Sequence, residues 1–268
     1  MNQHEFSPDP GPLAEPDADG NVINVTRAED HVAIVRFARP PSNYFSIPLL
    51  SALAGALEQV DADPDVHTIV LAADGRNFCA GAELTQAHEK PEQIYAAAYR
   101  LFAIRKPIVA AVQGAAIGGG LGLTLIADFR VVAPSTRMAV NFVKIGIHPG
   151  FAITLLLPRV VGQQKAAELL YTGRRINGEE ALRIGLADRL VEEGDLLDAA
   201  LTLARQIAEN APLAVEATRA TLRDGLLDDI RRQTDMEARK QNELSVTDDF
   251  AEGILAVQER RAGNWKRR

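Results

Sequence analysis

The chain is poor in side chains that form disulfides or bind metals. It has one cysteine, Cys79, in 268 residues, so it can form no internal disulfide and cannot build a cysteine metal site from that thiol alone. Four of its five histidines, at positions 4, 31, 67 and 88, show no spacing typical of a metal site. We therefore expect neither a disulfide framework nor a bound metal.

Long apolar runs and an N-terminal targeting sequence are also lacking. No apolar run approaches the roughly 18 to 20 residues that a membrane-spanning helix requires. Residues 1–20 contain no Lys or Arg and are rich in Pro, Asp and Glu, which is typical neither of a signal peptide nor of a mitochondrial presequence. We expect residues 1–20 to be a disordered leader on a soluble, cytoplasmic protein that does not bind membranes.

Positive charge is in short supply as well. The 29 Lys and Arg against 36 Asp and Glu give a formal net charge of −7. This balance argues against nucleic acid or an anionic membrane as the main partner. An anionic ligand remains open, because local basic groups matter more than the total charge. The length allows one large domain, or one domain with a smaller appendage.

Strand and helix patterns alternate in the first part of the chain. Residues 68–72 form a continuous apolar run, which is typical of a strand buried on both faces. Ser46 is placed to cap a helix that repeats leucine along one face. The alternation implies crossover connections and a largely parallel sheet. The predicted strands are 22–25, 32–37, 68–72, 107–112 and 129–133, and two of the predicted helices are 93–104 and 118–126.

After about Gly162 every pattern is helical. This second part is expected to pack on the α/β core or on a neighbouring subunit. The predicted helices are 163–171, 178–184, 196–209, 212–223, 229–244 and 248–261.

Two segments rich in small residues are candidates for a ligand site. Residues 76–84 follow the buried strand, and residues 113–122 run into an apolar helix. Small residues let a ligand approach the backbone, and glycines at a helix start expose N–H donors. Leu123 stands where a dinucleotide fingerprint needs its third glycine, and no nucleotide P-loop pattern occurs. Each segment alone is equally compatible with a tight connection.

Together, the segments resemble the signature of the crotonase (enoyl-CoA hydratase/isomerase) superfamily. The matching motifs are F-x-A-G-A-E-L at 78–84, K-P-I-V-A-A-V-x-G at 106–114 and G-G-G at 118–120. Asn43 takes the place of the family's early asparagine. The resemblance extends from about Val22 to Trp265, and its further stretches are G-x-x-P-G at 146–150, L-P-R-x-x-G at 157–162, the segment 172–188 and the terminal 252–261.

The resemblance implies an α/β fold, namely a crotonase-type spiral of ββα and βαβ turns over residues 21–190. A helical C-terminal region, residues 191–268, would support homotrimers or homohexamers. The implied substrate is an acyl-CoA thioester, and no separate cofactor is needed because coenzyme A is part of that substrate. The backbone N–H groups of Ala82 and Gly119 would form an oxyanion hole, in which fixed donors stabilise the charge that develops on the thioester oxygen.

The resemblance also assigns residues to substrate binding. The adenine pocket would lie around the backbone of Ala80, Ala82 and Leu84, with Gly118 of the triplet bordering the same site. A base for the phosphates would come from the C-terminal helix of a neighbour, as Arg260 or Arg261. The basic run at the end of the chain is equally explained as a solvated helix end.

Two positions depart from the hydratase pattern. The family's two catalytic glutamates are replaced by Gly122 and Phe142, neither of which can transfer a proton. A general base typically contributes about a hundred- to ten-thousandfold in rate, so hydration by two glutamates is doubtful. Phe142 is expected to line an apolar acyl pocket instead.

His148, in the loop 146–150, is the first candidate for a substitute acid/base, because imidazole titrates near neutrality. Glu83 is the reserve. Asn141 could bind substrate, and Cys79 could act as a nucleophile or simply pack in the core.

Three functions are compatible with these motifs. The leading hypothesis is an enoyl-CoA hydratase/isomerase-family enzyme, a lyase or isomerase. The alternatives are a non-catalytic acyl-CoA-binding protein, and another superfamily lyase or hydrolase that performs decarboxylation or C–C cleavage.

Overall fold

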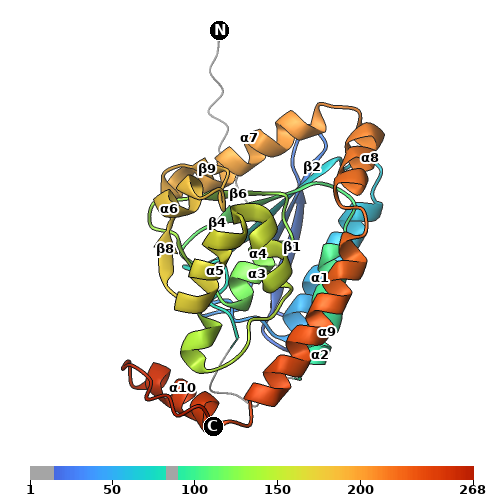
Figure 1. The fold of residues 1–268 in the computed structure, drawn as a ribbon. Coiled ribbons are helices and arrows are strands. Elements are labelled where there is room, and N and C mark those ends of the chain that lie inside the picture. The colour runs from blue at the N-terminus through green and yellow to red at the C-terminus, as the bar shows by residue number, and fades with distance from the viewer. Residues whose placement is uncertain (1–14, 83–89) are drawn as a thin grey trace.

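A six-stranded sheet forms the centre of the protein. The structure is a computed structural model that describes residues 15–82 and 90–268 (Figure 1). The strand order is β1-β2-β3-β4-β6-β9; β1 pairs antiparallel with β2 and all other neighbours are parallel, so the predicted largely parallel sheet is confirmed. The strands are β1 (Val22–Arg27), β2 (Val32–Ala38), β3 (Thr68–Ala73), β4 (Ile108–Val112), β6 (Phe129–Val132) and β9 (Arg189–Leu190).

Both faces of this sheet are covered, as the apolar run of β3 predicted. Alternate side chains of a strand point to opposite faces. Ile69 and Leu71 belong to the larger core beneath α1 (Ile47–Ala62) and α2 (Pro91–Phe102), whereas Val70 packs in a second core with Leu201 of α7 (Leu196–Ala208). The sheet is therefore the middle layer between helices.

The first helix begins where the sequence predicted. The Ser46 hydroxyl accepts a hydrogen bond from the Leu49 N–H, which satisfies one of the unpaired donors of the first turn. Leu49, Leu53 and Leu57 then recur on the buried face. The i, i+4 spacing of these leucines therefore seats α1 on the core.

A second, three-stranded sheet was not predicted. It contains β5 (Ala115–Ile117), β7 (Arg137–Ala139) and β8 (Arg175–Asn177). Strands of three residues are too short to show an alternating pattern. At Gly114 the chain turns from β4 into β5 with φ +56°, and a β-carbon there would lie 1.9 Å from the Arg76 carbonyl oxygen. Only glycine fits this bend.

Helices follow the last strand, with α7 across the sheet and α8 and α9 along the side that carries α1 and α2 (Figure 1). The prediction of an all-helical stretch after Gly162 is wrong at β8 and β9, which interrupt it. None of the helices in the described residues combines the length and hydropathy needed to cross a membrane. The remaining helices are α3 (Gly119–Thr124), η1 (Asn141–Ile145), α4 (Ile153–Val161), α5 (Gln163–Thr172), α6 (Gly178–Arg183), η2 (Glu193–Asp195), α8 (Pro212–Leu222), α9 (Leu226–Leu244) and α10 (Asp248–Gln258).

Candidate active site

The two segments rich in small residues lie side by side. The Cys79 N–H donates to the Ala115 carbonyl at 2.9 Å, and the Ile117 N–H donates to the Cys79 carbonyl at 3.0 Å. These bonds run in the parallel manner, so residue 79 extends the small sheet beyond β5. The fold therefore places 79–82 next to 115–119.

The ladder between them stops at Gly81. This glycine has φ +92°, and a β-carbon on it would lie 2.7 Å from the Ile117 carbonyl oxygen. Its own carbonyl accepts a hydrogen bond from the Phe45 N–H instead of from the neighbouring segment. The Ala82 and Gly119 N–H groups lie just beyond this interruption.

Two amides at this point have no acceptor. Within residues 15–82 and 90–268, neither the Ala82 N–H nor the Gly119 N–H donates a hydrogen bond to the protein. The preceding Gly118 N–H is already bonded to the Ala139 carbonyl of β7 at 2.8 Å. Gly119 therefore carries the first unused donor of the triplet, because the first N–H groups of a helix lack intrahelical partners.

Each glycine of the triplet is required by its surroundings. Gly118 has φ +56°, a backbone conformation that residues other than glycine rarely adopt. A β-carbon on Gly119 would lie 2.3 Å from the Phe45 ring, and one on Gly120 would lie 2.1 Å from the Cys79 carbonyl oxygen. The triplet thus lets α3 start directly against the neighbouring backbone.

A cavity of about 890 Å³ opens at these segments. Ala80, Ala82, Ile117 and Asn141 line it, and α10 contributes further side chains, with Arg260 just after the helix. Helix α10 approaches closely because Gly146 and Gly253 have no side chains; β-carbons there would overlap its backbone and that of η1. The full lining is Pro41, Ser42, Tyr44, Arg76, Asn77, Ala80, Ala82, Ala115, Ile117, Arg137, Asn141, Arg175, Ile254, Val257, Gln258 and Arg260.

Four exposed arginines surround this cavity: Arg76, Arg137, Arg175 and Arg260. Arg137 and Arg175 come from neighbouring strands, where Arg175 pairs with Ala139, so both lie on one face of the small sheet. No side chain among the described residues forms an ion pair or hydrogen bond with any of the four guanidinium groups. The cavity therefore offers concentrated positive charge on a chain with net negative charge.

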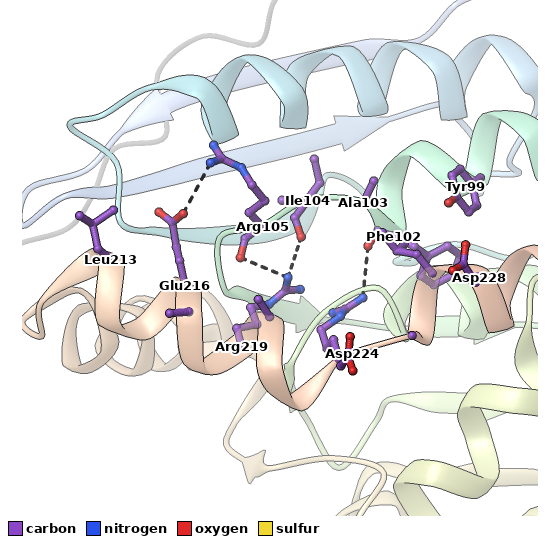
Figure 2. A pocket seen from close by; sticks show the side chains of 15 residues that line it. Tyr99, Phe102, Ala103, Ile104, Arg105, Leu213, Glu216, Arg219, Asp224 and Asp228 are labelled. Atoms are coloured by element: carbon purple, nitrogen blue, oxygen red, sulfur yellow. Dashed lines mark hydrogen bonds and ion pairs between the residues drawn. The ribbon is translucent and has the colours of Figure 1, made fainter.

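A second cavity, of about 660 Å³, lies under α8 and differs in its charge (Figure 2). Arg219 binds both carboxylate oxygens of Asp128 at 2.9 Å and donates to the Ile104 carbonyl. Arg105 pairs with Asp61 and, at 3.7 Å, with Glu216. These guanidinium groups are already neutralised, so the cavity of Figure 2 is a poor site for an anionic ligand.

Aromatic rings lie against position 122 and at position 142, where the resemblance would place two glutamates. A β-carbon on Gly122 would lie 2.7 Å from the β-carbon of Phe151, which leaves no room for a longer side chain. The Phe142 ring lies 3.7 Å from the β-carbon position of Gly118, and Asn141 Oδ1 lies 3.6 Å from it. Phe45 and Phe151 are 6.0 Å apart, centroid to centroid. The interior side of the site is therefore apolar.

The acid/base candidate His148 lies apart from the cavity lining. His148 is half-buried, its Nδ1 lies 2.6 Å from the Pro149 carbonyl oxygen, and it does not line the 890 Å³ cavity. That contact requires Nδ1 to carry the proton, which leaves Nε2 as the basic nitrogen when the ring is neutral. Glu83 and Leu84 lie outside the described residues, as do residues 1–14 of the expected leader.

Cys79 is not suited to act as a nucleophile. Its side chain is fully buried, and burial raises the pKa of the thiol to about 12. The thiolate is the reactive form of cysteine, so this side chain belongs to the core. Arg260 lines the cavity of its own chain, whereas the resemblance placed it in a neighbour's site. Arg261 is bonded to Glu252 and Glu259.

Sequence reasoning missed two arginines of the cavity and the structural role of Asn43. Arg137 and Arg175 gave no signal, because they are far apart in the sequence and lie in strands that are too short to predict. Asn43 was recognised only by its position; the structure shows that it accepts from the Arg39 N–H and donates to the carbonyls of Asp74 and Asn77. It therefore holds together the loops that border the cavity.

Known proteins resemble this chain over almost its full length. The family model described as "Enoyl-CoA hydratase/isomerase" matches residues 27–268. A crotonyl-CoA hydratase from Syntrophomonas wolfei is 34% identical over 251 residues, which cover 90% of this chain and 96% of the relative. A short-chain-enoyl-CoA hydratase from Clostridium acetobutylicum is 30% identical over 250 residues, with coverages of 88% and 95%.

A solved structure is similar to this chain over nearly its full length as well. The crystal structure of an enoyl-CoA hydratase/isomerase from Pseudoalteromonas atlantica has a TM-score of 0.82 at 31% identity, covering 91% of this chain and 99% of that chain. The predicted fold, a spiral α/β core with a helical C-terminal region, is therefore confirmed.

Proposed function

The chain belongs to the enoyl-CoA hydratase/isomerase family, and we propose that it binds an acyl-CoA thioester in the 890 Å³ cavity. The thioester carbonyl oxygen accepts hydrogen bonds from the Ala82 and Gly119 N–H groups. The observation that carries this proposal is the pair of unused amides at the end of the interrupted ladder. Ala80 and Gly118 border the same place, and Phe142 forms part of the apolar wall for the acyl group.

The charge of the cavity supports coenzyme A as the carrier. Coenzyme A brings several phosphates, and Arg76, Arg137, Arg175 and Arg260 are exposed around the cavity. Guanidinium groups bind phosphate through charge-assisted and often bidentate hydrogen bonds. No cofactor apart from the substrate is needed for this chemistry.

We propose that the protein is an enzyme that stabilises a thioester enolate. Two fixed N–H donors favour the negative charge that develops on the carbonyl oxygen, and loss of one such donor typically lowers the rate by about a hundred- to thousandfold. His148, with its Nε2 available, is our proposed acid/base, and Glu83 is the reserve. Whether the reaction is a hydration, an isomerisation or a bond cleavage depends on where the proton must go.

One observation favours a second candidate, an acyl-CoA-binding protein without catalysis. None of the described residues that line the cavity is a carboxylate or an imidazole. A protein that kept the amides and lost its proton-transfer groups would look like this. The same observation suits a superfamily member that performs decarboxylation or C–C cleavage, because such a reaction depends less on a pair of glutamates.

The test uses the purified protein with a panel of enoyl-, β-keto- and malonyl-type CoA esters. Calorimetry measures binding and mass spectrometry follows products. Turnover of any ester supports the enzyme, and tight binding without turnover supports the binding protein. If no acyl-CoA binds, the proposed function is wrong.

His148 is tested on whichever ester turns over. His148→Ala is expected to lower kcat at least tenfold, because general acid–base catalysis contributes about a hundredfold or more. His31→Ala is the matched control, since His31 lies on the exposed loop between β1 and β2. A smaller loss for His148→Ala would move the proposal to Glu83→Ala.

We also propose that the protein forms homotrimers or homohexamers through its helical C-terminal region. In α8 only Arg219 is buried, while Leu213 and Leu222 are 79% and 76% exposed. Cavities lie on both sides of this helix. A helix that turns its leucines outward is explained if a second copy covers it.

A further inference from the structure

The loop between η1 and α4 is held in an unfavourable backbone conformation. Phe151 and Ala152 have φ values of +64° and +56°, in the left-handed region that residues other than glycine rarely adopt. Gly150, just before them, has no space for a side chain, because a β-carbon there would lie 1.7 Å from the Tyr95 hydroxyl oxygen. Strain of this kind persists only where surrounding contacts fix it.

The fixing contact comes from a helix far along the chain. Helix α4 starts after Ala152, which has no side chain that could cap it. Glu237 of α9 supplies the missing acceptor: its carboxylate takes hydrogen bonds from the Ala152 N–H at 2.8 Å and the Thr154 N–H at 3.2 Å. The Thr154 hydroxyl donates to it as well, at 2.5 Å.

Two neighbouring polar residues of α9 add further hydrogen bonds to this segment. Gln241, one turn after Glu237, donates to the His148 carbonyl at 2.9 Å and accepts from the Tyr95 hydroxyl at 2.7 Å. Gln233, one turn before, donates to the Thr154 hydroxyl oxygen at 2.6 Å. Glu237 is fully buried in this cluster. These three α9 residues therefore hold the chain at His148, before Phe151, and at Ala152 and Thr154, after it.

On its other side the loop packs against aromatic residues beside the glycine triplet, which belong to the proposed acyl-binding wall. Phe151 packs against Gly122 of α3, and its ring lies 6.0 Å from that of Phe45. Phe45 in turn lies directly against Gly119, which carries one of the two unused amides. A shift of the loop would move Phe151, then Phe45, and so change the space beside the Gly119 N–H.

We propose that Glu237 is a positioning residue: it caps α4 from α9 and thereby holds Phe151 and Phe45 in place beside the Gly119 amide. The part of this inference that concerns a ligand rests on the proposed function. Because the wall is apolar and faces the thioester end of the site, its displacement weakens recognition of the acyl group and leaves the contacts of the arginines with coenzyme A unchanged.

The experiment compares Glu237→Gln with Glu243→Gln. Glu243 is exposed on the same helix, and its ion-pair partner among the described residues is Lys240. Hydrogen exchange followed by mass spectrometry reports the loop without any ligand. Glu237→Gln is expected to speed exchange in the peptide that contains Ala152 and Thr154 by roughly tenfold, because the glutamine amide has one acceptor oxygen where Glu237 uses two to accept from these backbone N–H groups. In Glu237→Gln, exchange in β3 and β4 is expected to stay at the wild-type rate. In Glu243→Gln, exchange of the loop peptide is expected to stay at the wild-type rate as well.

Calorimetry then separates positioning from general stability. Glu237→Gln is expected to bind a non-hydrolysable acyl-CoA analogue about tenfold more weakly and to bind coenzyme A with wild-type affinity. A merely structural role would weaken both ligands together. If the Gln variant does not fold, Thr154→Val is the second variant. It removes only the hydroxyl, which donates to Glu237 and accepts from Gln233, and the same two changes are expected at smaller size.

The outcomes distinguish this inference from the proposed function. If loop exchange in the variants equals that of the wild type, or if acyl-CoA and coenzyme A lose affinity equally, Glu237 does not position the site. If the wild type binds neither ligand, the proposed function fails, while the exchange result still decides whether Glu237 holds the loop.

Discussion

Gly120 and Gly55 are both helical glycines, but the space around them is opposite. A β-carbon on Gly120 would lie 2.1 Å from the Cys79 backbone oxygen, whereas one on Gly55 in α1 would meet nothing within 4 Å. Gly120→Ala is expected to lower the free energy of unfolding by roughly 1–3 kcal/mol, the usual scale of overpacking. Gly55→Ala should raise it by about 0.5–1 kcal/mol, since alanine is the better helix former.

Urea unfolding of the two variants beside the wild type measures both changes. If Gly120→Ala were as stable as the wild type, α3 would not start directly against the neighbouring segment.

Arg137 and Arg175 provide a second prediction at the scale of single residues. Each is exposed at the cavity, and its guanidinium group has no hydrogen-bond or ion-pair partner among the described residues. Replacing either by Gln is expected to weaken coenzyme A binding about three- to tenfold, less than for a buried charged hydrogen bond because solvent screens the interaction. Calorimetry at low and high salt measures this loss, which shrinks as salt screens the charges.

Arg239→Gln, an exposed arginine on α9 away from the cavity, is the control and should bind as the wild type does. Equal affinities for all three variants would contradict a phosphate-binding role for the two strand arginines.

At the scale of one element, the burial of Glu237 in α9 makes stability depend on pH. Burial raises its pKa from 4.5 to about 7, even though hydrogen bonds from Thr154 and Ala152 act in the opposite direction. The folded protein therefore holds a proton that the unfolded chain releases, and the free energy of unfolding falls as pH rises from about 4.5 to 7. The pKa shift corresponds to a loss of about 3 kcal/mol in the free energy of unfolding over this pH range.

Glutamine does not titrate, so Glu237→Gln should lack this component. Tyr95, which faces Glu237, stays neutral over the same range, because burial and the nearby Glu237 charge raise its pKa further. Urea unfolding at pH 5 and pH 8 checks the prediction. The same pH dependence in both proteins would show that another group is responsible.

At the scale of the whole molecule, the outward leucines of α8 predict assembly. The wild type is expected to be a trimer or hexamer by light scattering. Introducing Glu at both Leu213 and Leu222 should lower the mass to that of a monomer, because charged side chains would have to be buried at the interface. The circular dichroism of the variant should match that of the wild type.

Tyr171→Glu, at an 80% exposed position at the end of α5, is the control and should keep the wild-type mass. A monomeric wild type, or a double variant that keeps the wild-type mass, would show that α8 is not the contact surface.

The sequence alone determined the features that depend on local patterns. The leucine spacing of α1 and its Ser46 cap predicted that helix, and the apolar run of β3 predicted a strand buried on both faces. The small residues at 80–82 and 118–120 predicted that two stretches of backbone would approach a ligand or each other. Each of these signals lies within a few residues, because periodicity, capping and steric freedom are properties of neighbouring positions.

Only the tertiary structure decided the features that join distant segments. Strands β5, β7 and β8 are defined by their pairing rather than by any pattern of three residues. Their pairing is what brings Arg137 and Arg175 to one face. Likewise, the sequence around Ala152 does not predict that Glu237 caps α4, because Glu237 lies 85 residues away along the chain. Such contacts depend on how helices and strands pack in space, and that packing sums weak preferences over the entire chain.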